Sequence, residues 1–240
     1  MLNILYEDET VLVVWKPVGM ESQSGHGFDA DMVSEIRRYL STGKPVDNHK
    51  LSTKSVEPYV GVIHRLDKPV SGVMVYAKTK NAAAALSKQV AEGKMHKKYL
   101  AVLCGKPVDN NGTYVDYLKQ DKKNNCSRIV DKSDPESKRA ELEYKVLDCI
   151  QTEEKDPQYL SLVEIKLLTG RHHQIRVQFS GHGTPLYGDG KYGNNEKAVR
   201  KSLALCAYHL KFKHPATGKI MDFQIKPDTG AFKLFSKSND

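Results

Sequence analysis

A carboxylate flanked by two cations is the first residue of this sequence whose type and surroundings suggest chemistry. Asp67 lies between Arg65 and Lys68 in the segment His64–Gly72. This segment leads directly into the apolar run of 72–78. Neighbouring positive charges favour an ionised carboxylate. A loop at the end of a strand also suits a reactive group better than a packing residue. The alternative is an aspartate that only caps a turn, with the following Ser-Gly pair as ordinary turn residues.

A second candidate segment is Lys97-Lys98-Tyr99, at the start of a predicted strand. Tyr99 could stack on a nucleobase while the two lysines contact phosphates. Aromatic residues in strands usually pack in a core, so this pattern carries little weight alone.

A third segment, Thr169–Gln178, concentrates cations and is followed by the glycine-rich stretch Gly183–Gly193. The first turns of a short predicted helix would hold Arg171, His172, His173 and Arg176. Cations there oppose the positive end of the helix dipole unless a negative group lies nearby. An RNA phosphate or the Asp67 carboxylate could supply that charge, and a solvated basic turn is the less favoured alternative.

Alternating and continuous apolar patterns predict the strands that position these segments. Strands are predicted over Ile4–Tyr6, Val11–Lys16, Gly72–Lys78, Lys98–Leu103, 139–150, 159–168, 204–213 and 220–225. Pro17 and Gly19 end the second strand, 139–150 and 159–168 form an antiparallel pair, and His214–Gly218 is the last turn.

Helices are fewer. One runs from a cap at Asp29 to about Leu40, a second runs from its cap Asn81 to Glu92 with Gly93 as its stop, and a third follows Gly170. The polar stretch 41–58 reads as a loop. Because strands outnumber helices and are mostly antiparallel, we expect an α+β fold with a mixed, mainly antiparallel sheet and flanking helices.

Composition and charge limit the function classes. The 240 residues are 39% hydrophobic and 28% charged, with no apolar run near the ~20 residues of a membrane span. The start lacks the features of a signal peptide, which predicts a cytoplasmic protein. The four cysteines show neither disulfide nor zinc spacing. Lys and Arg exceed Asp and Glu by 37 to 29, a net charge of +8 that suits a polyanion such as RNA.

Taken together, these segments resemble the RluA-type family of pseudouridine synthases. The family's His-Arg-Leu-Asp segment, leading to Ser-Gly and a buried strand, is matched by His64–Lys78, and its Lys-x-Tyr strand by Lys97–Tyr99. Thr169–Arg176 and Gly183–Gly193 match its Thr-Gly-Arg-x-His-Gln-Ile-Arg and Gly-x-Pro-x-x-Gly-Asp-x-x-Tyr-Gly segments. Asp8–Gly19 and Leu210–Gly218 also match, so the resemblance covers nearly the whole chain in the expected order.

The resemblance implies an enzyme that isomerises uridine to pseudouridine in ribosomal or transfer RNA, with no cofactor and no metal. It assigns the catalytic carboxylate to Asp67, places Tyr99 against the target ring, and pairs Arg176 with Asp67. Arg65 would fill the space that the flipped nucleotide leaves. Four further residues are expected to contact RNA: His64, Lys98, Arg171 and His173.

Three residues depart from the family pattern: Val70 replaces a common Thr, His172 a usual Thr or Ser, and Gln178 a usual His. None replaces a proposed catalytic group, so they put substrate preference and loop packing in doubt. We expect one catalytic domain over residues 1–240 with no separate N-terminal RNA-binding domain, acting as a monomer. The segments 41–58 and 106–138, rich in Lys and Asn, either contact RNA or are disordered surface connections.

Two other functions compete with this hypothesis. A metal-dependent hydrolase would use the histidines, but the i, i+4 pair with a nearby Glu is missing. A non-catalytic RNA-binding protein would not need Asp67, Tyr99 and Arg176 together.

Overall fold

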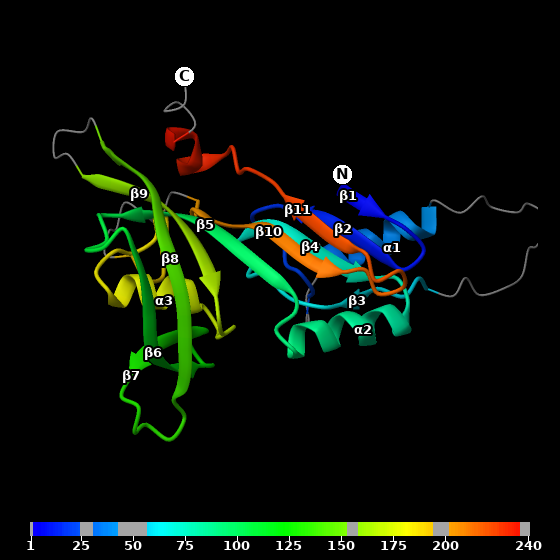
Figure 1. Ribbon diagram of the computed structural model, residues 1–240, viewed down its shortest axis with the longest axis horizontal. Coiled ribbons are helices and arrows are strands. Elements are labelled where there is room, and N and C mark those ends of the chain that lie inside the picture. Colours follow the sequence, from blue (N-terminus) through cyan, green and yellow to red (C-terminus); the bar gives the residue numbers. More distant parts are fainter. Residues whose placement is uncertain (1, 25–30, 43–56, 153–157, 194–201, 236–240) are drawn as a thin grey trace, which may run out of the picture. The chain divides into compact units, whose positions relative to one another are not determined.

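The computed structural model describes residues 2–24, 31–42, 57–152, 158–193 and 202–235 (Figure 1). The chain forms two compact units. The first contains residues 1–96 and 209–225, and the second contains residues 97–208 and 226–240. Strands dominate both units, which confirms the expected α+β class with a mainly antiparallel sheet.

The first unit is built on strands in the order β1, β2, β4, β10 and β11, with the short β3 also paired to β4. Their bounds are β1 Asn3–Glu7, β2 Val11–Lys16, β3 Gly61–Val62, β4 Ser71–Ala77, β10 Leu205–Lys213 and β11 Ile220–Gln224. Only the part of β10 from His209 onward belongs to this unit. The β1–β2, β2–β4, β3–β4 and β10–β11 pairs are antiparallel. These strands confirm the strands predicted near both ends of the chain. They also confirm the predicted strand 72–78, which follows the Asp67 segment.

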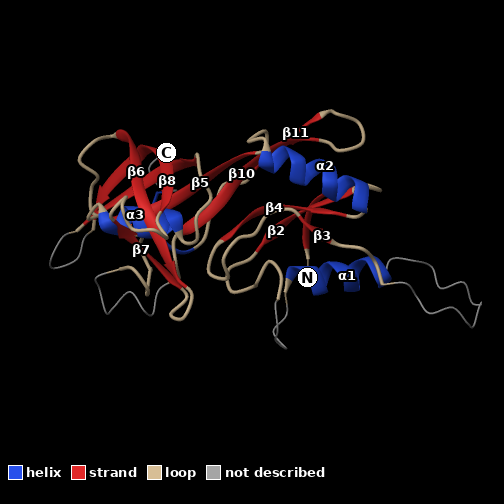
Figure 2. Cartoon of the chain, turned by 90° about the horizontal axis from the view of Figure 1, so that it is seen from below, coloured by secondary structure: helices blue, strands red, loops and turns tan. Residues whose placement is uncertain are grey.

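Helices cover both faces of β2 and β4. Leu86 of α2 (Lys80–Ala91) packs with Val11, Val13, Val73 and Val75 in one hydrophobic core. Successive side chains of a strand point to opposite faces. The alternate residues of both strands are also buried, and α1 (Met32–Thr42) lies on that opposite face (Figure 2). All seven residues of β4 are therefore buried, as its continuous apolar sequence predicted.

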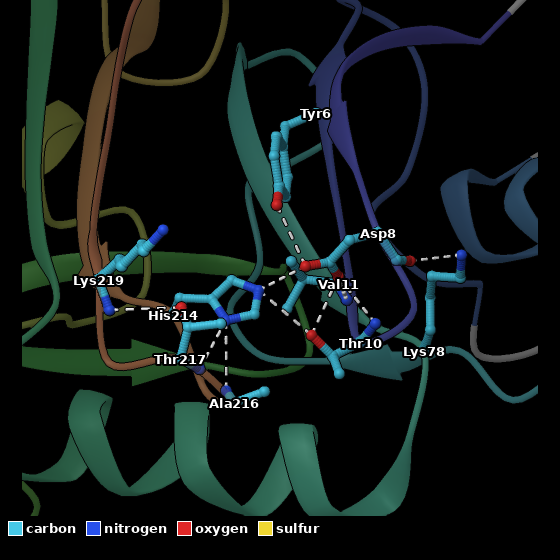
Figure 3. Close-up of polar contacts among 9 residues, drawn as sticks. All are labelled: Tyr6, Asp8, Thr10, Val11, Lys78, His214, Ala216, Thr217 and Lys219. Atoms are coloured by element: carbon cyan, nitrogen blue, oxygen red, sulfur yellow. Dashed lines mark hydrogen bonds and ion pairs between the residues drawn. The ribbon is translucent and has the colours of Figure 1, made fainter.

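A buried histidine joins the two turns at one end of this unit (Figure 3). The Nδ1 atom of His214 accepts hydrogen bonds from the backbone N–H groups of Ala216 and Thr217. The ring proton therefore lies on Nε2, which donates to the Asp8 carboxylate at 2.6 Å. Asp8 also accepts from the backbone N–H groups of Thr10 and Val11. This network fixes the β1–β2 turn against the β10–β11 turn, so it joins the first and last matched motifs.

The second unit has strands in the order β5, β9, β8, β6 and β7. Their bounds are β5 His96–Cys104, β6 Asn111–Asp121, β7 Cys126–Val130, β8 Lys138–Gln151 and β9 Tyr159–Leu167. Each successive pair in this order is antiparallel, including the predicted partnership of β8 with β9. Helix α3 (Gln174–Gly181) packs on β6 and β8, where Phe179 contacts Tyr114 and Tyr144 edge-on. A 3₁₀ helix spans Gly230–Phe235.

Three local predictions were wrong or lie beyond the described residues. Residues 106–138 are not the disordered connection that was one alternative for them, because they contain the β6–β7 hairpin. The hairpin was not predicted because Lys, Asn and Asp residues interrupt its alternating pattern and resemble a loop. The α2 cap is Thr79, whose hydroxyl accepts from the Ala82 N–H, and Asn81 lies inside the first turn of the helix. At α1 the Asp31 carboxylate accepts from the N–H groups of Val33 and Ser34. The predicted cap, Asp29, lies outside the described residues.

The predicted end of α2 at Gly93 is confirmed. Gly93 follows α2 with a positive φ of 67°, the left-handed conformation that stops a helix. No helix within the described part of the chain is long and apolar enough to span a bilayer.

Candidate active site

The loop that carries Asp67 is held rigidly while the aspartate itself is exposed. On one side of it, the Ser22 hydroxyl donates to the Leu66 carbonyl at 2.7 Å and accepts from the Leu66 N–H at 2.9 Å. On the other side, the Lys68 carbonyl accepts from the Gly19 N–H at 2.8 Å. The Val70 N–H closes the turn on the Asp67 carbonyl at 2.9 Å. Asp67 is therefore a solvent-facing carboxylate on a fixed backbone.

Lys16, the last residue of β2, anchors this loop from beneath. Its side chain is fully buried. Its ammonium group donates to the carbonyls of Met20 at 2.6 Å, Pro17 at 3.0 Å and Lys68 at 3.3 Å. Burial lowers the pKa of Lys16 to about 8, although the charges of Asp67 and Glu21 act in the opposite direction. The motif Trp15-Lys-Pro-Val-Gly19 thus serves the Asp67 loop, a role that reading the sequence did not assign.

The other groups of the His64–Gly72 segment differ in exposure. Arg65 is exposed, whereas His64 is buried and its Nε2 atom accepts from the Val75 N–H of β4 at 3.3 Å. Val70, where the family commonly has Thr, is buried. Direct contact with RNA is therefore open to Arg65, while His64 supports the loop from the sheet.

Tyr99 is buried on β5, opposite Ile165 of β9. Its neighbour Lys98 points to the other face, where its ammonium group pairs with Glu164 at 3.1 Å. The same carboxylate accepts a hydrogen bond from the Tyr208 hydroxyl. Lys98 thus forms an ion pair within its own unit, and its side chain remains 39% exposed.

Helix α3 begins directly after His173, which has a left-handed backbone with φ of 54°. Such a conformation is uncommon for a residue other than glycine and is found at functional sites. His173 is buried, and its Nδ1 atom lies 2.7 Å from the Tyr192 hydroxyl. Burial, followed by the charge of Arg176, lowers the pKa of His173 to about 3, so the ring is neutral at physiological pH.

The four basic residues of Thr169–Gln178 were predicted to lie in the first turns of the helix, and most of them do not. Arg171 and His172 precede the helix, and Arg176 alone of the four lies inside it. The exposed Arg171 donates from Nε to the Arg139 carbonyl at 2.9 Å. The negative partner of Arg176 in this unit is Asp189, at 2.6 and 2.7 Å. Reading the sequence proposed only Asp67 or a phosphate for that role, although the Gly-Asp-x-x-Tyr-Gly motif marks Asp189.

The two departures from the family pattern near α3 are integrated into side-chain networks. His172 lies 2.9 Å from the Ser127 hydroxyl through Nδ1 and 3.1 Å from the Asn125 amide oxygen through Nε2. The Gln178 amide donates to Asp116 of β6 at 2.7 Å. Both residues therefore connect α3 or its start to the β6–β7 hairpin.

Asp67 belongs to the first unit, and Tyr99 and Arg176 belong to the second. The pairing of Asp67 with Arg176 accordingly stays a prediction. Within the described ranges, no three His, Cys, Asp or Glu side chains converge as metal ligands would. The four cysteines form no disulfide bond.

The fold is that of pseudouridylate synthase domains. A solved structure titled human RNA pseudouridylate synthase domain containing 1 superposes with a TM-score of 0.74 at 23% identity, covering 95% of this chain and 84% of that one. A second, human RNA pseudouridylate synthase domain containing 4, has a TM-score of 0.70 at 25% identity, covering 93% and 88%.

Sequence comparison is equally direct. The sequence model of RNA pseudouridylate synthase matches residues 10–181, a range that includes Asp67, Tyr99 and Arg176. The chain is 36% identical over 234 residues to ribosomal large subunit pseudouridine synthase D of Zymomonas mobilis, covering 94% of this chain and 69% of that protein. It is 31% identical to ribosomal large subunit pseudouridine synthase C of Escherichia coli, covering 98% and 69%. The chain belongs to the RNA pseudouridylate synthase family, and is an isomerase of uridine in RNA.

Proposed function

We propose that this enzyme modifies large-subunit ribosomal RNA and that Asp67 is its catalytic carboxylate. The observation that carries the assignment is the Asp67 loop itself, an exposed aspartate between backbone positions pinned by Ser22, Gly19 and Lys16. A reacting group must be held in place before its substrate arrives, because positioning supplies much of the rate acceleration. The RNA class is suggested by the relatives whose names specify the ribosomal large subunit.

The reaction is an isomerisation in which nothing is oxidised or reduced. The N1–C1′ bond of uridine breaks, the uracil rotates, and a C5–C1′ bond forms; the C5 proton leaves and N1 is protonated. Atoms and electrons balance without oxidant or reductant. A carboxylate can serve by adding to the base or by assisting deprotonation of the sugar, and either route divides one difficult step into easier ones.

Tyr99 and Arg176 complete the proposed catalytic set. Tyr99, on the buried strand β5, would pack against the flipped uracil and assist the transfer of the C5 proton. Arg176 would pair with Asp67 and hold it in position. Flipping a nucleotide costs a few kcal/mol, and insertion of the exposed Arg65 side chain into the vacated stack would offset part of this.

Basic groups on both units would hold the RNA by its phosphates. Arg65, Lys98 and Arg171 are at least partly exposed and suited to direct contact. His64 and His173 are buried, so their part in RNA binding would be to support the segments that carry those cations. Action in the cytoplasm and a monomeric state stay predictions.

Mapping pseudouridine in RNA from cells with and without the gene tests this proposal. We expect one or a few sites in large-subunit ribosomal RNA to lose modification, and expression of the wild-type protein to restore them. An Asp67→Ala variant should bind the same RNA with unchanged affinity and restore no site.

Asp222→Ala is a matched control, since Asp222 is another exposed aspartate of the first unit. It should restore modification fully. Sites lost only from transfer RNA would refute the ribosomal assignment, and modification by Asp67→Ala would refute the catalytic one.

A further inference from the structure

The guanidinium group of Arg176 is bound along one edge by a buried carboxylate. Asp189 accepts from Nε at 2.7 Å through one oxygen and from Nη2 at 2.6 Å through the other. Arg176 is 6% exposed and Asp189 is 1% exposed. A two-point contact of this kind fixes the plane of the guanidinium as well as its position. Because guanidinium has five N–H groups, a second carboxylate can meet Arg176 only through the N–H groups of the other edge.

Asp189 is itself held by its turn. Its Oδ1 atom accepts from the backbone N–H groups of Lys191 at 3.0 Å and Tyr192 at 3.1 Å. Its carbonyl accepts from the Gly193 N–H at 2.9 Å. Burial alone would raise the pKa of Asp189, but the hydrogen bonds and charge of Arg176, with these backbone donors, lower it. The carboxylate therefore stays ionised and cannot rotate without losing several contacts.

Tyr192 covers a face of the same guanidinium. The Arg176 guanidinium carbon lies 5.0 Å from the centre of the Tyr192 ring, within cation–π range. The Tyr192 hydroxyl accepts from the Ser127 N–H of β7 at 2.8 Å and lies 2.7 Å from His173 Nδ1 at the start of α3. The ring is thus fixed to the hairpin and to the helix that carries Arg176.

We propose that Asp189 and Tyr192 are positioning residues that orient the guanidinium of Arg176 toward the catalytic carboxylate. This inference rests on the proposed function, in which Arg176 pairs with Asp67. The two residues follow Arg176 in the sequence and act from one turn, Gly188–Gly193. They touch neither RNA nor the reacting atoms in this role, so their effect must pass through Arg176.

A double-mutant cycle separates this role from a general structural one. Single-turnover rates of pseudouridine formation would be measured at saturating RNA for wild type, Asp189→Asn, Arg176→Lys and the double variant. The RNA is ribosomal RNA purified from cells lacking the gene. We expect each single change to slow the reaction by about 100-fold, the scale of a misplaced catalytic group. The double variant should be no slower than the slower single variant, because both changes remove the same two-point contact between guanidinium and carboxylate.

If Asp189→Asn slows the reaction as much in the Arg176→Lys variant as in wild type, the proposal is overturned. A wild-type rate for Asp189→Asn alone would overturn it too. Glu143→Gln is the control, since it removes a carboxylate from an exposed ion pair with Lys166 in the same unit. It should leave the rate unchanged. RNA affinity and thermal unfolding of every variant would be measured in parallel.

If Asp189→Asn does not fold, variants of Tyr192 test the proposal instead. Tyr192→Leu should slow the reaction by about tenfold with unchanged RNA affinity, the size expected for a lost cation–π contact. It should have no effect when combined with Arg176→Gln, in which the positive charge is already absent. A wild-type rate for Tyr192→Leu would then refute the inference. Failure of the proposed function looks different: wild type would form no pseudouridine, or Asp67→Ala would remain active.

Discussion

Lys16 links a single buried charge to the segment that presents Asp67. Its ammonium group holds three carbonyl groups, one of them that of Lys68, next to the aspartate. Removal from water disfavours the charged form, which is why its pKa falls to about 8 in the folded protein. In the unfolded chain the pKa returns to about 10.4. Lys16 therefore makes the stability of the protein depend on pH.

The sign of that dependence follows from proton binding. Between about pH 8 and pH 10.4 the unfolded chain keeps the Lys16 proton and the folded protein does not, so the free energy of unfolding rises with pH. The full rise is about 3 kcal/mol. We expect wild type to gain that amount of unfolding free energy relative to Lys16→Met as the pH rises from about 8 to 10.4. Urea denaturation of both proteins at several pH values measures this difference.

Comparison with Lys16→Met cancels the titration of all other groups. A difference that stays constant with pH would contradict the prediction. A direct check is the Cε chemical shift of Lys16, which should titrate near pH 8.

At the scale of elements, the turn Gly188–Gly193 places two functional side chains by backbone geometry. Gly188 has a φ of 74°, and a Cβ added there would lie 2.2 Å from the Ser202 carbonyl oxygen. A Cβ at Gly193 would lie 2.5 Å from the Asp189 carbonyl oxygen. The two glycines of the motif therefore allow the close packing from which Asp189 and Tyr192 reach Arg176.

A Gly188→Ala substitution should destabilise the protein by about 3 kcal/mol, because a backbone clash adds to left-handed strain. Gly183→Ala is the matched comparison. Gly183 also has a positive φ, 82°, but a Cβ there would meet nothing within 4 Å. It should cost only about 1 kcal/mol. Urea denaturation measures both, and equal losses would show that the Ser202 contact is not rigid.

The β6–β7 hairpin is the second element that serves the site. Its turn is tied to the Gly188–Gly193 segment by the Lys191 ammonium, which donates to the carbonyls of Asn124 and Asn125. Ser127 contacts both His172 and Tyr192. The substitution of Thr or Ser by His at position 172 is thus accommodated by a hairpin that offers Ser127 and Asn125 as partners.

For the whole molecule, the net charge of +8 predicts binding to RNA that depends strongly on salt. The logarithm of the association constant should fall with the logarithm of salt concentration, with a slope of about −0.7 per neutralised phosphate of a single strand. Arg65→Gln and Arg171→Gln should each reduce the slope by about 0.7. Lys88→Gln, on the exposed side of α2, should leave it unchanged.

Fluorescence anisotropy of a labelled RNA fragment at several salt concentrations provides the measurement. A slope that neither arginine variant alters would place the phosphate contacts elsewhere on the protein.

Local patterns in the sequence determined much of the fold and singled out the carboxylate that we propose as catalytic. Apolar alternation predicted β8 and β9, the continuous apolar run predicted β4, and the glycine after α2 predicted its end. Asp67 stood out because a carboxylate between two cations before a buried strand is itself a local feature. Such features depend on residues within a few positions of one another, and sequence displays those directly.

Only the tertiary structure decided which partners the functional side chains take. Arg176 pairs with Asp189 because the Gly188–Gly193 turn folds back onto α3, and Gln178 reaches Asp116 because β6 packs beneath that helix. Lys16 serves the Asp67 loop from a strand 52 residues before Lys68. These contacts arise when distant segments pack together, and the free energy of that packing depends on the whole fold rather than on any one segment's pattern.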